Sequence, residues 1–186
     1  MTYKTHNAFG LGLMLAIAIY QPAESIGVAT IILALIANAV GSIAPDMDQG
    51  SNKLWSMLPV GNIIGKFLRR IFLGHRAVSH SFLGIWIIYK INMWIFFNIF
   101  NPNFVNPEWI VLGFMVGYLS HILIDGLTEE GVPLLWPLPW KVGFPPIKPW
   151  RIKTGKWFEN LIIFPGILLW IGWMGWDKWL HLILFL

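Results

Sequence analysis

The sequence contains no cysteine and few charged residues, and both shortages limit what the protein can be. Without thiols, any metal must be held by His, Asp and Glu, and disulfides and cysteine nucleophiles are excluded. Only 12% of the 186 residues are charged, whereas 56% are hydrophobic. That balance exceeds the apolar share of soluble domains and indicates a membrane protein. We find no nucleic-acid-binding motif and no internal repeat, so a nucleic-acid partner is not expected.

Five apolar runs predict an all-α polytopic membrane helical bundle of about five transmembrane helices, in a single integral-membrane domain covering residues 1–186. The runs cover residues 8–20, 26–43, 82–100, 109–124 and 161–176. The fourth run carries Gly113 and Gly117, a small-residue face suited to close helix packing. Residues 60–73 have the spacing of an interfacial amphipathic helix. Residues 126–158 are rich in proline and tryptophan and predict a lid-like interfacial loop.

The most unusual stretch is residues 74–81, Gly-His-Arg-Ala-Val-Ser-His-Ser. It places ionisable groups directly before an apolar run. Such groups are costly near lipid and are usually functional. His75 and His80 are five residues apart, so they do not share a helical face. We expect His75 in the loop and His80 in the first turn of the following helix.

Two further pairs of polar residues stand at the ends of apolar runs. Asp46 and Asp48 follow Pro45 directly, so both carboxylates can face one point. His121 and Asp125 are four residues apart, and a helix stacks them on one face.

Five alternating spans bring these polar residues to one face of the membrane, and among the histidines His181 alone falls on the other side. The residues on that face are His6, Asp46, Asp48, His75, His80, His121, Asp125 and Glu159. Most lysines and arginines map to the same face, which the positive-inside rule makes the cytoplasm. The lysines and arginines on this face could instead bind an anionic substrate, in which case they would not indicate the cytoplasmic side. We expect a multi-pass protein of the bacterial inner membrane with its N-terminus and this face toward the cytoplasm.

Three imidazoles and three carboxylates in this set predict a divalent-metal site for one or two ions, zinc first and manganese second. They are His75, His80, His121, Asp46, Asp48 and Asp125. Each alone has a plainer interpretation. A boundary histidine can simply pack, Asp-x-Asp can form a turn and cap, and His121 with Asp125 can be a buried hydrogen-bonded pair.

Other polar residues near the predicted site allow two interpretations each. Arg76 is either a positive-inside charge or a clamp for an oxyanion or phosphate. Ser79 and Ser81 can simply cap the following helix, or Ser79 can contact a substrate oxygen. Thr128 is either a solvated loop residue or a substrate contact. Glu159 suits a helix N-terminus whatever its role.

Three motifs, residues 41–48, 74–81 and 117–137, together resemble the YdjM-like bacterial inner-membrane proteins, a family of metal-dependent hydrolases. They read Gly-Ser-Ile-Ala-Pro-Asp-Met-Asp, Gly-His-Arg-Ala-Val-Ser-His-Ser and Gly-Tyr-Leu-Ser-His-Ile-Leu-Ile-Asp-Gly-Leu-Thr-Glu-Glu-Gly-Val-Pro-Leu-Leu-Trp-Pro. The resemblance implies that His6 and Glu159 join the metal-binding set, with Arg76 and Thr128 inside the motifs. Ser79 stands where threonine is common.

The resulting hypothesis is a metal-dependent hydrolase at the cytoplasmic membrane interface. Asp48 would take a proton and Arg76 would meet negative charge on the substrate. The substrate would be a phosphoester of a lipid or other amphiphile, or alternatively an acyl or amide bond in a lipid. Different classes of function are a non-catalytic divalent-ion binding or transport protein, and a scaffold whose histidines only pack. The oligomeric state is not predicted.

Overall fold

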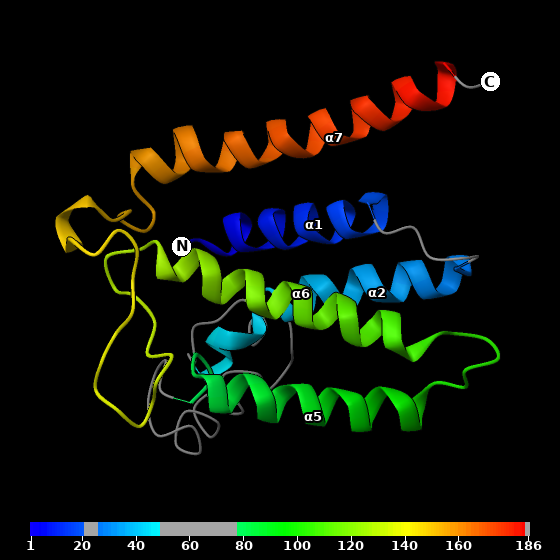
Figure 1. The fold of residues 1–186 in the computed structure, drawn as a ribbon, viewed down its shortest axis with the longest axis horizontal. Coiled ribbons are helices and arrows are strands. Elements are labelled where there is room, and N and C mark those ends of the chain that lie inside the picture. The colour runs from blue at the N-terminus through cyan, green and yellow to red at the C-terminus, as the bar shows by residue number, and fades with distance from the viewer. Residues whose placement is uncertain (21–25, 49–77, 185–186) are drawn as a thin grey trace, which may run out of the picture.

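The computed structural model describes residues 1–20, 26–48 and 78–184, and these residues form long helices that lie side by side (Figure 1). The long helices are α1 (Tyr3–Tyr20), α2 (Val28–Gly41), α5 (Phe82–Ile99), α6 (Pro107–Gly126) and α7 (Phe164–Leu184). The short ones are the 3-10 helices η1 (Ala44–Asp48) and η2 (Lys148–Trp150) and the π-helix η3 (Glu159–Ile163). Within these ranges no strand forms, so the predicted all-α class is confirmed.

Three of the described helices are long and apolar enough to cross a membrane. They are Phe82–Ile99, Pro107–Gly126 and Glu159–Lys178, the last beginning in η3. α2 is apolar but has only 14 residues, about 21 Å of helix, which is less than a bilayer core of about 30 Å. The membrane character is therefore confirmed, and five crossings stay a prediction. The predicted interfacial helix at 60–73 lies outside the described residues.

The closest helix contact in the described structure joins α2 to α6. A Cβ atom on Gly113 would collide with the carbonyl oxygen of Ala34, and one on Gly117 with that of Asn38. Across the same contact, Asn38 Nδ2 donates to the Gly113 carbonyl oxygen at 3.1 Å. The small-residue face predicted for this run is confirmed, because only glycine lets the two backbones approach so closely.

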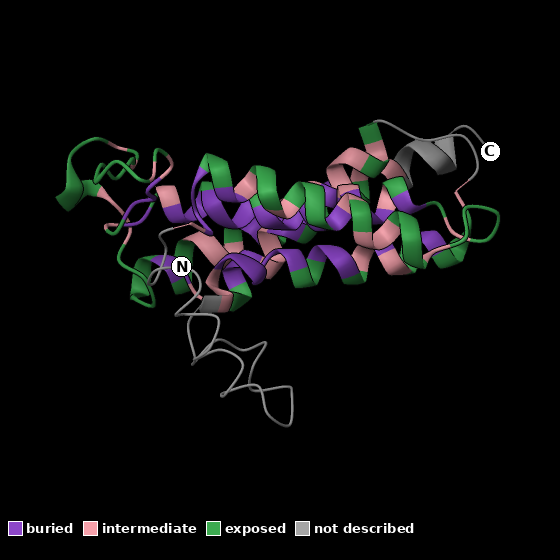
Figure 2. Ribbon diagram, turned by 90° about the horizontal axis from the view of Figure 1, so that it is seen from below, coloured by how far each residue is buried: buried purple, intermediate pink, exposed green. Residues whose placement is uncertain are grey.

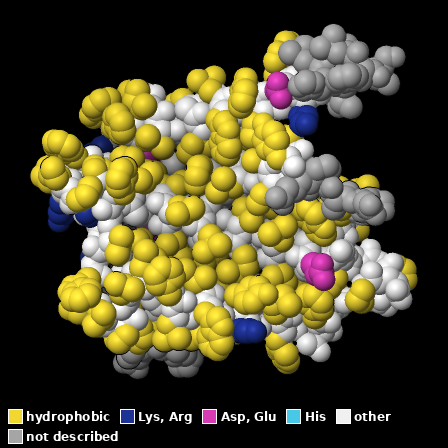
Figure 3. All heavy atoms as spheres, viewed as in Figure 1, with side chains coloured by type: hydrophobic (Ala, Val, Ile, Leu, Met, Phe, Trp, Pro, Cys, Tyr) yellow, Lys and Arg dark blue, Asp and Glu magenta, His cyan; other side chains and the backbone are white. Residues whose placement is uncertain are grey.

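α6 is the central helix of the bundle, and the outer helices present apolar surface. Tyr118 and Ile110 on α6 are fully buried, whereas Trp94 on α5 and Leu169 on α7 are largely exposed. Buried residues accordingly run through the middle of the helix layer in Figure 2. Figure 3 shows hydrophobic side chains spread over the outer face of the helices, with several Lys and Arg at the left-hand end. This surface suits contact with lipid tails.

The segment between α6 and α7, residues 126–158, is an ordered loop at one end of the bundle. Its backbone forms isolated bridges, and the Arg151 guanidinium donates to the carbonyl oxygens of Gly143, Pro145 and Pro146. Trp150 in this loop is largely exposed, as expected of an interfacial aromatic. Its action as a lid stays a prediction.

The helix ends that carry the predicted site lie together at the left of Figure 1. There α1, α5 and α7 begin, and α2 and α6 end. This arrangement, expected from alternating spans, brings together residues that are far apart in the sequence.

Candidate metal centre

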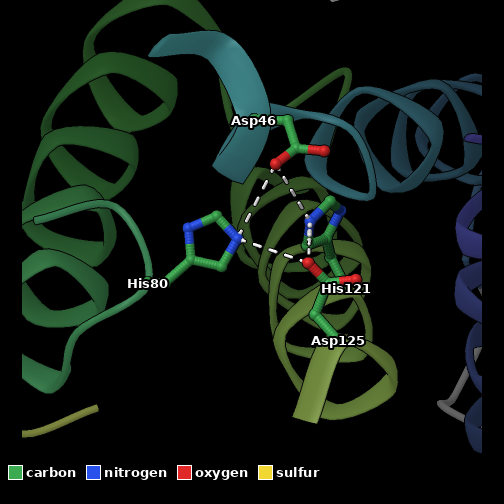
Figure 4. A group of neighbouring side chains, drawn as sticks. All are labelled: Asp46, His80, His121 and Asp125. Carbon is green, nitrogen blue, oxygen red and sulfur yellow. Dashed lines mark ion pairs between the residues drawn. The ribbon is translucent and has the colours of Figure 1, made fainter. Parts of the chain in front are cut away.

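Four side chains, Asp46, His80, His121 and Asp125, converge at this end of the bundle (Figure 4). Each offers one ligand atom, and these atoms all lie within 4.8 Å of one another. Nε2 of His80 lies 3.8 Å and Nε2 of His121 3.7 Å from Asp46 Oδ1. The same nitrogens lie 3.8 and 3.6 Å from Asp125 Oδ2. Ligands bound about 2.0–2.2 Å from a tetrahedral ion lie about 3.3–3.6 Å apart, so the spacing is close to that of one ion's ligands.

Two of the four ligands share one face of α6. His121 and Asp125 are separated by four residues, and their side chains meet as predicted. They lie in the last turns of the helix, just before it ends at Gly126. The third ligand, Asp46, lies in η1 directly after Pro45.

The fourth ligand, His80, precedes α5 rather than lying in its first turn, which corrects our expectation. Ser81 is the N-cap of α5, and its hydroxyl accepts a hydrogen bond from Gly84 N at 3.0 Å. The cap therefore falls one residue after the histidine. Tyr118 of α6 fixes this turn by donating its hydroxyl to the Ser79 carbonyl oxygen at 2.5 Å.

Hydrogen bonds behind the rings turn one nitrogen of each imidazole toward the group. His121 Nδ1 lies 2.7 Å from the Ser42 carbonyl oxygen, and His80 Nδ1 lies 3.0 Å from Ser79 Oγ. A carbonyl only accepts, so His121 must donate from Nδ1, which leaves Nε2 unprotonated in the neutral ring. Nε2 of both rings is buried and has no hydrogen-bond partner among the described residues. Buried polar atoms are rarely left so, and a bound cation would satisfy both.

The two ligands outside the spanning helices are in metal-binding protonation states at neutral pH. Burial lowers the pKa of His80, which keeps the imidazole neutral. Burial alone would raise the pKa of Asp46, but the imidazoles of His121 and His80, whose Nε2 atoms lie 3.7 and 3.8 Å from its Oδ1, hold that pKa well below its usual range. A neutral imidazole and an ionised carboxylate are the forms that bind a metal.

His6 lies against this group without being one of the four. Its ring stacks on His121 with centroids 3.7 Å apart and 10° between the planes. His6 Nε2 lies 3.3 Å from Asp125 Oδ1, the carboxylate oxygen opposite the one that faces His80 and His121. The backbone nitrogen of Met1 lies 2.6 Å from that same Oδ1. α1 therefore reaches the group through its first turn.

Glu159 was also predicted to be a metal ligand, but its side chain does not reach the group of four. Its carboxylate is buried and accepts four hydrogen bonds, from the Thr2 backbone nitrogen and hydroxyl, the Thr5 hydroxyl and the Gly155 backbone nitrogen. The position of Glu159 is explained by these contacts with the start of α1.

The remaining predicted residues are placed as follows. The Ser79 hydroxyl lies on His80, and Thr128 is buried, donating its hydroxyl to the Asp125 carbonyl oxygen at 2.7 Å. Their contacts with a substrate stay predictions. The Asp48 side chain and residues His75 and Arg76 lie outside the described part of the chain, so their predicted roles are likewise not tested.

Sequence reasoning missed several groups that support the site. The Ser42 carbonyl oxygen orients His121, but a backbone atom leaves no mark on residue type. Thr2 and Thr5 contact Glu159, and their only signal was their position beside His6. Ser42 itself stands in the motif that ends in Asp46 and Asp48, which was a further clue.

Comparison with known proteins identifies relatives of this chain. The family model described as YdjM inner membrane protein matches residues 1–186. The Bacillus subtilis protein YvsG is 29% identical over 163 residues, 88% of either chain. The Escherichia coli inner membrane protein YdjM is 33% identical over 132 residues, 71% of this chain and 61% of that protein. No solved structure matches the chain. The protein therefore belongs to the YdjM inner membrane protein family and is an inner membrane protein.

Proposed function

We propose that this protein is a metal-dependent hydrolase whose metal is bound by Asp46, His80, His121 and Asp125. The observation that carries the proposal is the convergence of two buried imidazole nitrogens, which lack hydrogen-bond partners in the described structure, with two carboxylates. Packing alone does not account for such atoms, because each would cost free energy without a partner. Two nitrogens and two oxygens suit zinc first and manganese second.

The chain supplies the geometry for such chemistry at an accessible point. The side chain of Asp46 is 22% exposed, whereas those of His80, His121 and Asp125 are at most 1% exposed. A substrate would therefore approach from the Asp46 side. A divalent ion bound there would polarise a substrate oxygen and lower the pKa of a water molecule to near neutrality. The four-residue group accounts for one ion, and His6, whose Nε2 lies 3.3 Å from Asp125 Oδ1, is a further donor beside it.

The position of the site favours an amphiphilic substrate with a negative headgroup. The group lies at the end of apolar helices, level with a loop that carries Lys141, Lys148, Lys153 and Lys156. A lipid whose headgroup reaches this level would place a phosphoester at the metal while its tails stay in the membrane. Asp48 as proton acceptor and Arg76 as partner of the phosphate complete the proposal, with the site toward the cytoplasm.

Phosphate release from a lipid phosphate by the purified protein tests the proposal. We expect activity that a chelator abolishes, that zinc or manganese restores, and that His80→Ala and His121→Ala remove. Asn98→Ala, an exposed position on α5, serves as the control and should keep full activity. A protein that retains less than one equivalent of transition metal and behaves identically after these substitutions would contradict the proposal.

Other outcomes of the same experiment identify the alternatives. Release of fatty acid rather than phosphate would indicate an acyl or amide hydrolase with the same centre. Divalent-ion flux in proteoliposomes that is lost in His121→Ala, without hydrolysis, would indicate transport. One observation bears on transport: the polar side chains of Asn7, Asn38, Ser42 and Ser120 continue from the site between α1, α2 and α6. Deeper in, the space between these helices is lined mainly by apolar side chains such as Met14, Leu15 and Leu35, which offer an ion no ligand.

A further inference from the structure

The carboxylate of Glu159 joins the start of η3, which leads into α7, to the start of α1. Oε1 accepts hydrogen bonds from Thr2 N at 2.7 Å, Thr2 Oγ1 at 2.8 Å and Thr5 Oγ1 at 2.7 Å. Oε2 accepts from Gly155 N at 2.7 Å, in the turn just before η3. Glu159 and Thr5 are both almost completely buried. Four donors on a buried carboxylate make a strong, directional connection, since bonds to a charged acceptor are stronger than neutral ones.

This connection acts as an N-terminal cap supplied by another helix. The first N–H groups of a helix have no intrahelical acceptor and carry partial positive charge. A carboxylate placed there satisfies a donor and meets the positive end of the helix dipole. Glu159 does so for α1 from 157 residues away along the chain. This side chain therefore helps to set the position and rotation of the first turn of α1, together with the contact of the Met1 nitrogen with Asp125.

His6 directly follows Thr5, so the same connection decides where its ring lies. That ring stacks on His121 and places Nε2 3.3 Å from Asp125 Oδ1. We infer that Glu159 is a positioning residue that holds His6 against the metal group through Thr2 and Thr5. The expected effect of Glu159 on metal binding rests on the proposed metal centre. The inference replaces the direct ligand role expected for Glu159, whose two oxygens already accept four hydrogen bonds.

Zinc affinity of the purified protein, measured by competition with a chromophoric chelator, tests the inference. Glu159→Gln should weaken zinc binding about 10-fold, the scale expected of groups that orient metal ligands. In this variant the amide NH₂ group of glutamine would face the N–H group of Gly155, so two donors would meet. The threonines would keep only a neutral oxygen, which is a weaker acceptor than a carboxylate. Thr5→Val removes one hydroxyl at nearly constant shape and should act in the same direction. Thr5→Ser keeps the hydroxyl and should restore binding.

Thr30→Val is the matched control, because it makes the same change at another buried threonine. Thr30 lies near the start of α2, at the other end of the bundle, where its hydroxyl accepts from Asn106 N at 3.1 Å. It should leave zinc affinity unchanged.

A double-mutant cycle separates positioning of His6 from a general loss of structure. In a His6→Ala background, Thr5→Val should cause no further loss of zinc affinity, because the residue it positions is gone. A full further loss would overturn the inference. Weakening by Glu159→Gln with no effect of Thr5→Val would also overturn it, because Glu159 would then act directly on the metal.

Chemical modification of the metal-free protein gives a readout that does not depend on the metal centre. Diethyl pyrocarbonate should modify His6 slowly in the wild type, because its side chain is only 2% exposed. The rate at His6 should rise several-fold relative to His121 in Glu159→Gln and Thr5→Val, but not in Thr30→Val. If the wild type binds no zinc, the proposed centre fails. Unchanged protection of His6 in both variants would then still overturn the positioning role.

Discussion

α5 and α6 are similar in length and hydropathy but differ in how much of each helix is buried. They have 18 and 20 residues and the same mean hydropathy of 1.5, yet 11% of the α5 span is buried against 56% of the α6 span. α5 presents Trp86 and Trp94 outward, whereas α6 carries His121 and Asp125 on its buried side. Total hydropathy therefore identifies a membrane helix but does not tell whether it faces lipid or protein.

The difference comes from where small and polar residues stand along each helix. Gly113 and Gly117 let α6 approach α2 closely, and Ser120 lies on that buried side. In α5, the polar residue Asn92 is satisfied locally, by donating to the Ile88 carbonyl oxygen at 2.8 Å. A helix with a small-residue face becomes central because its backbone can pack on a neighbour.

The largest effect should follow from removing a ligand on α6. Asp125→Asn should lower zinc affinity by more than the roughly 10–100-fold typical of outer-shell groups, because the side chain itself is proposed to bind the ion. Titration of the purified protein with zinc measures this. Glu108→Gln removes a carboxylate charge at the exposed opposite end of the same helix and should have no effect. Equal losses in both variants would refute the assignment.

Adding a methyl group at the α2–α6 contact should have the next largest effect. Gly117→Ala should destabilise the protein by about 1–3 kcal/mol or more, because the new Cβ meets backbone rather than a flexible side chain. Gly172→Ala on α7, where nothing lies within 4 Å, should be neutral or slightly stabilising. Thermal unfolding in detergent compares the two. Similar stability of both variants would show that α6 is not held by this contact.

A smaller effect is expected behind the ligand that precedes α5. Ser79→Ala removes the hydroxyl from His80 Nδ1 and should weaken zinc binding about 10-fold, or about 1.4 kcal/mol. Ser79→Thr keeps the hydroxyl and should bind zinc like the wild type. If alanine and threonine variants behave alike, the hydroxyl does not orient the ring.

The smallest effect should come from the lipid-facing side of α5. Lys90 is exposed within this span, so Lys90→Leu should change stability by less than about 0.5 kcal/mol and leave zinc affinity unaltered. Zinc titration and thermal unfolding of the variant measure both. A clear loss of zinc would mean that α5 contributes to the site through its outer face, contrary to the contrast with α6.

Much of the architecture could be predicted from the sequence. The apolar runs predicted the helices, and the four-residue step from His121 to Asp125 predicted their shared face. We expected His80 in the first turn of α5, and this was wrong. The helix begins after Ser81, because the hydroxyl of Ser81 rather than that of Ser79 accepts a hydrogen bond from the free N–H group of Gly84. The expected ligand Glu159 instead bonds to Thr2 and Thr5, since buried carboxylates take whichever donors the packing supplies.

The sequence by itself determined which polar residues stand at one end of the bundle, because apolar helices must run back and forth between two faces. Only the tertiary structure decided how each helix is rotated about its axis. That rotation turns His121 and Asp125 toward Asp46 and His80, and it leaves Glu159 turned toward α1. The physical reason is that hydropathy determines which segments lie in the membrane and which lie at its surfaces. The rotation of a helix about its axis depends instead on packing, glycine contacts and individual hydrogen bonds.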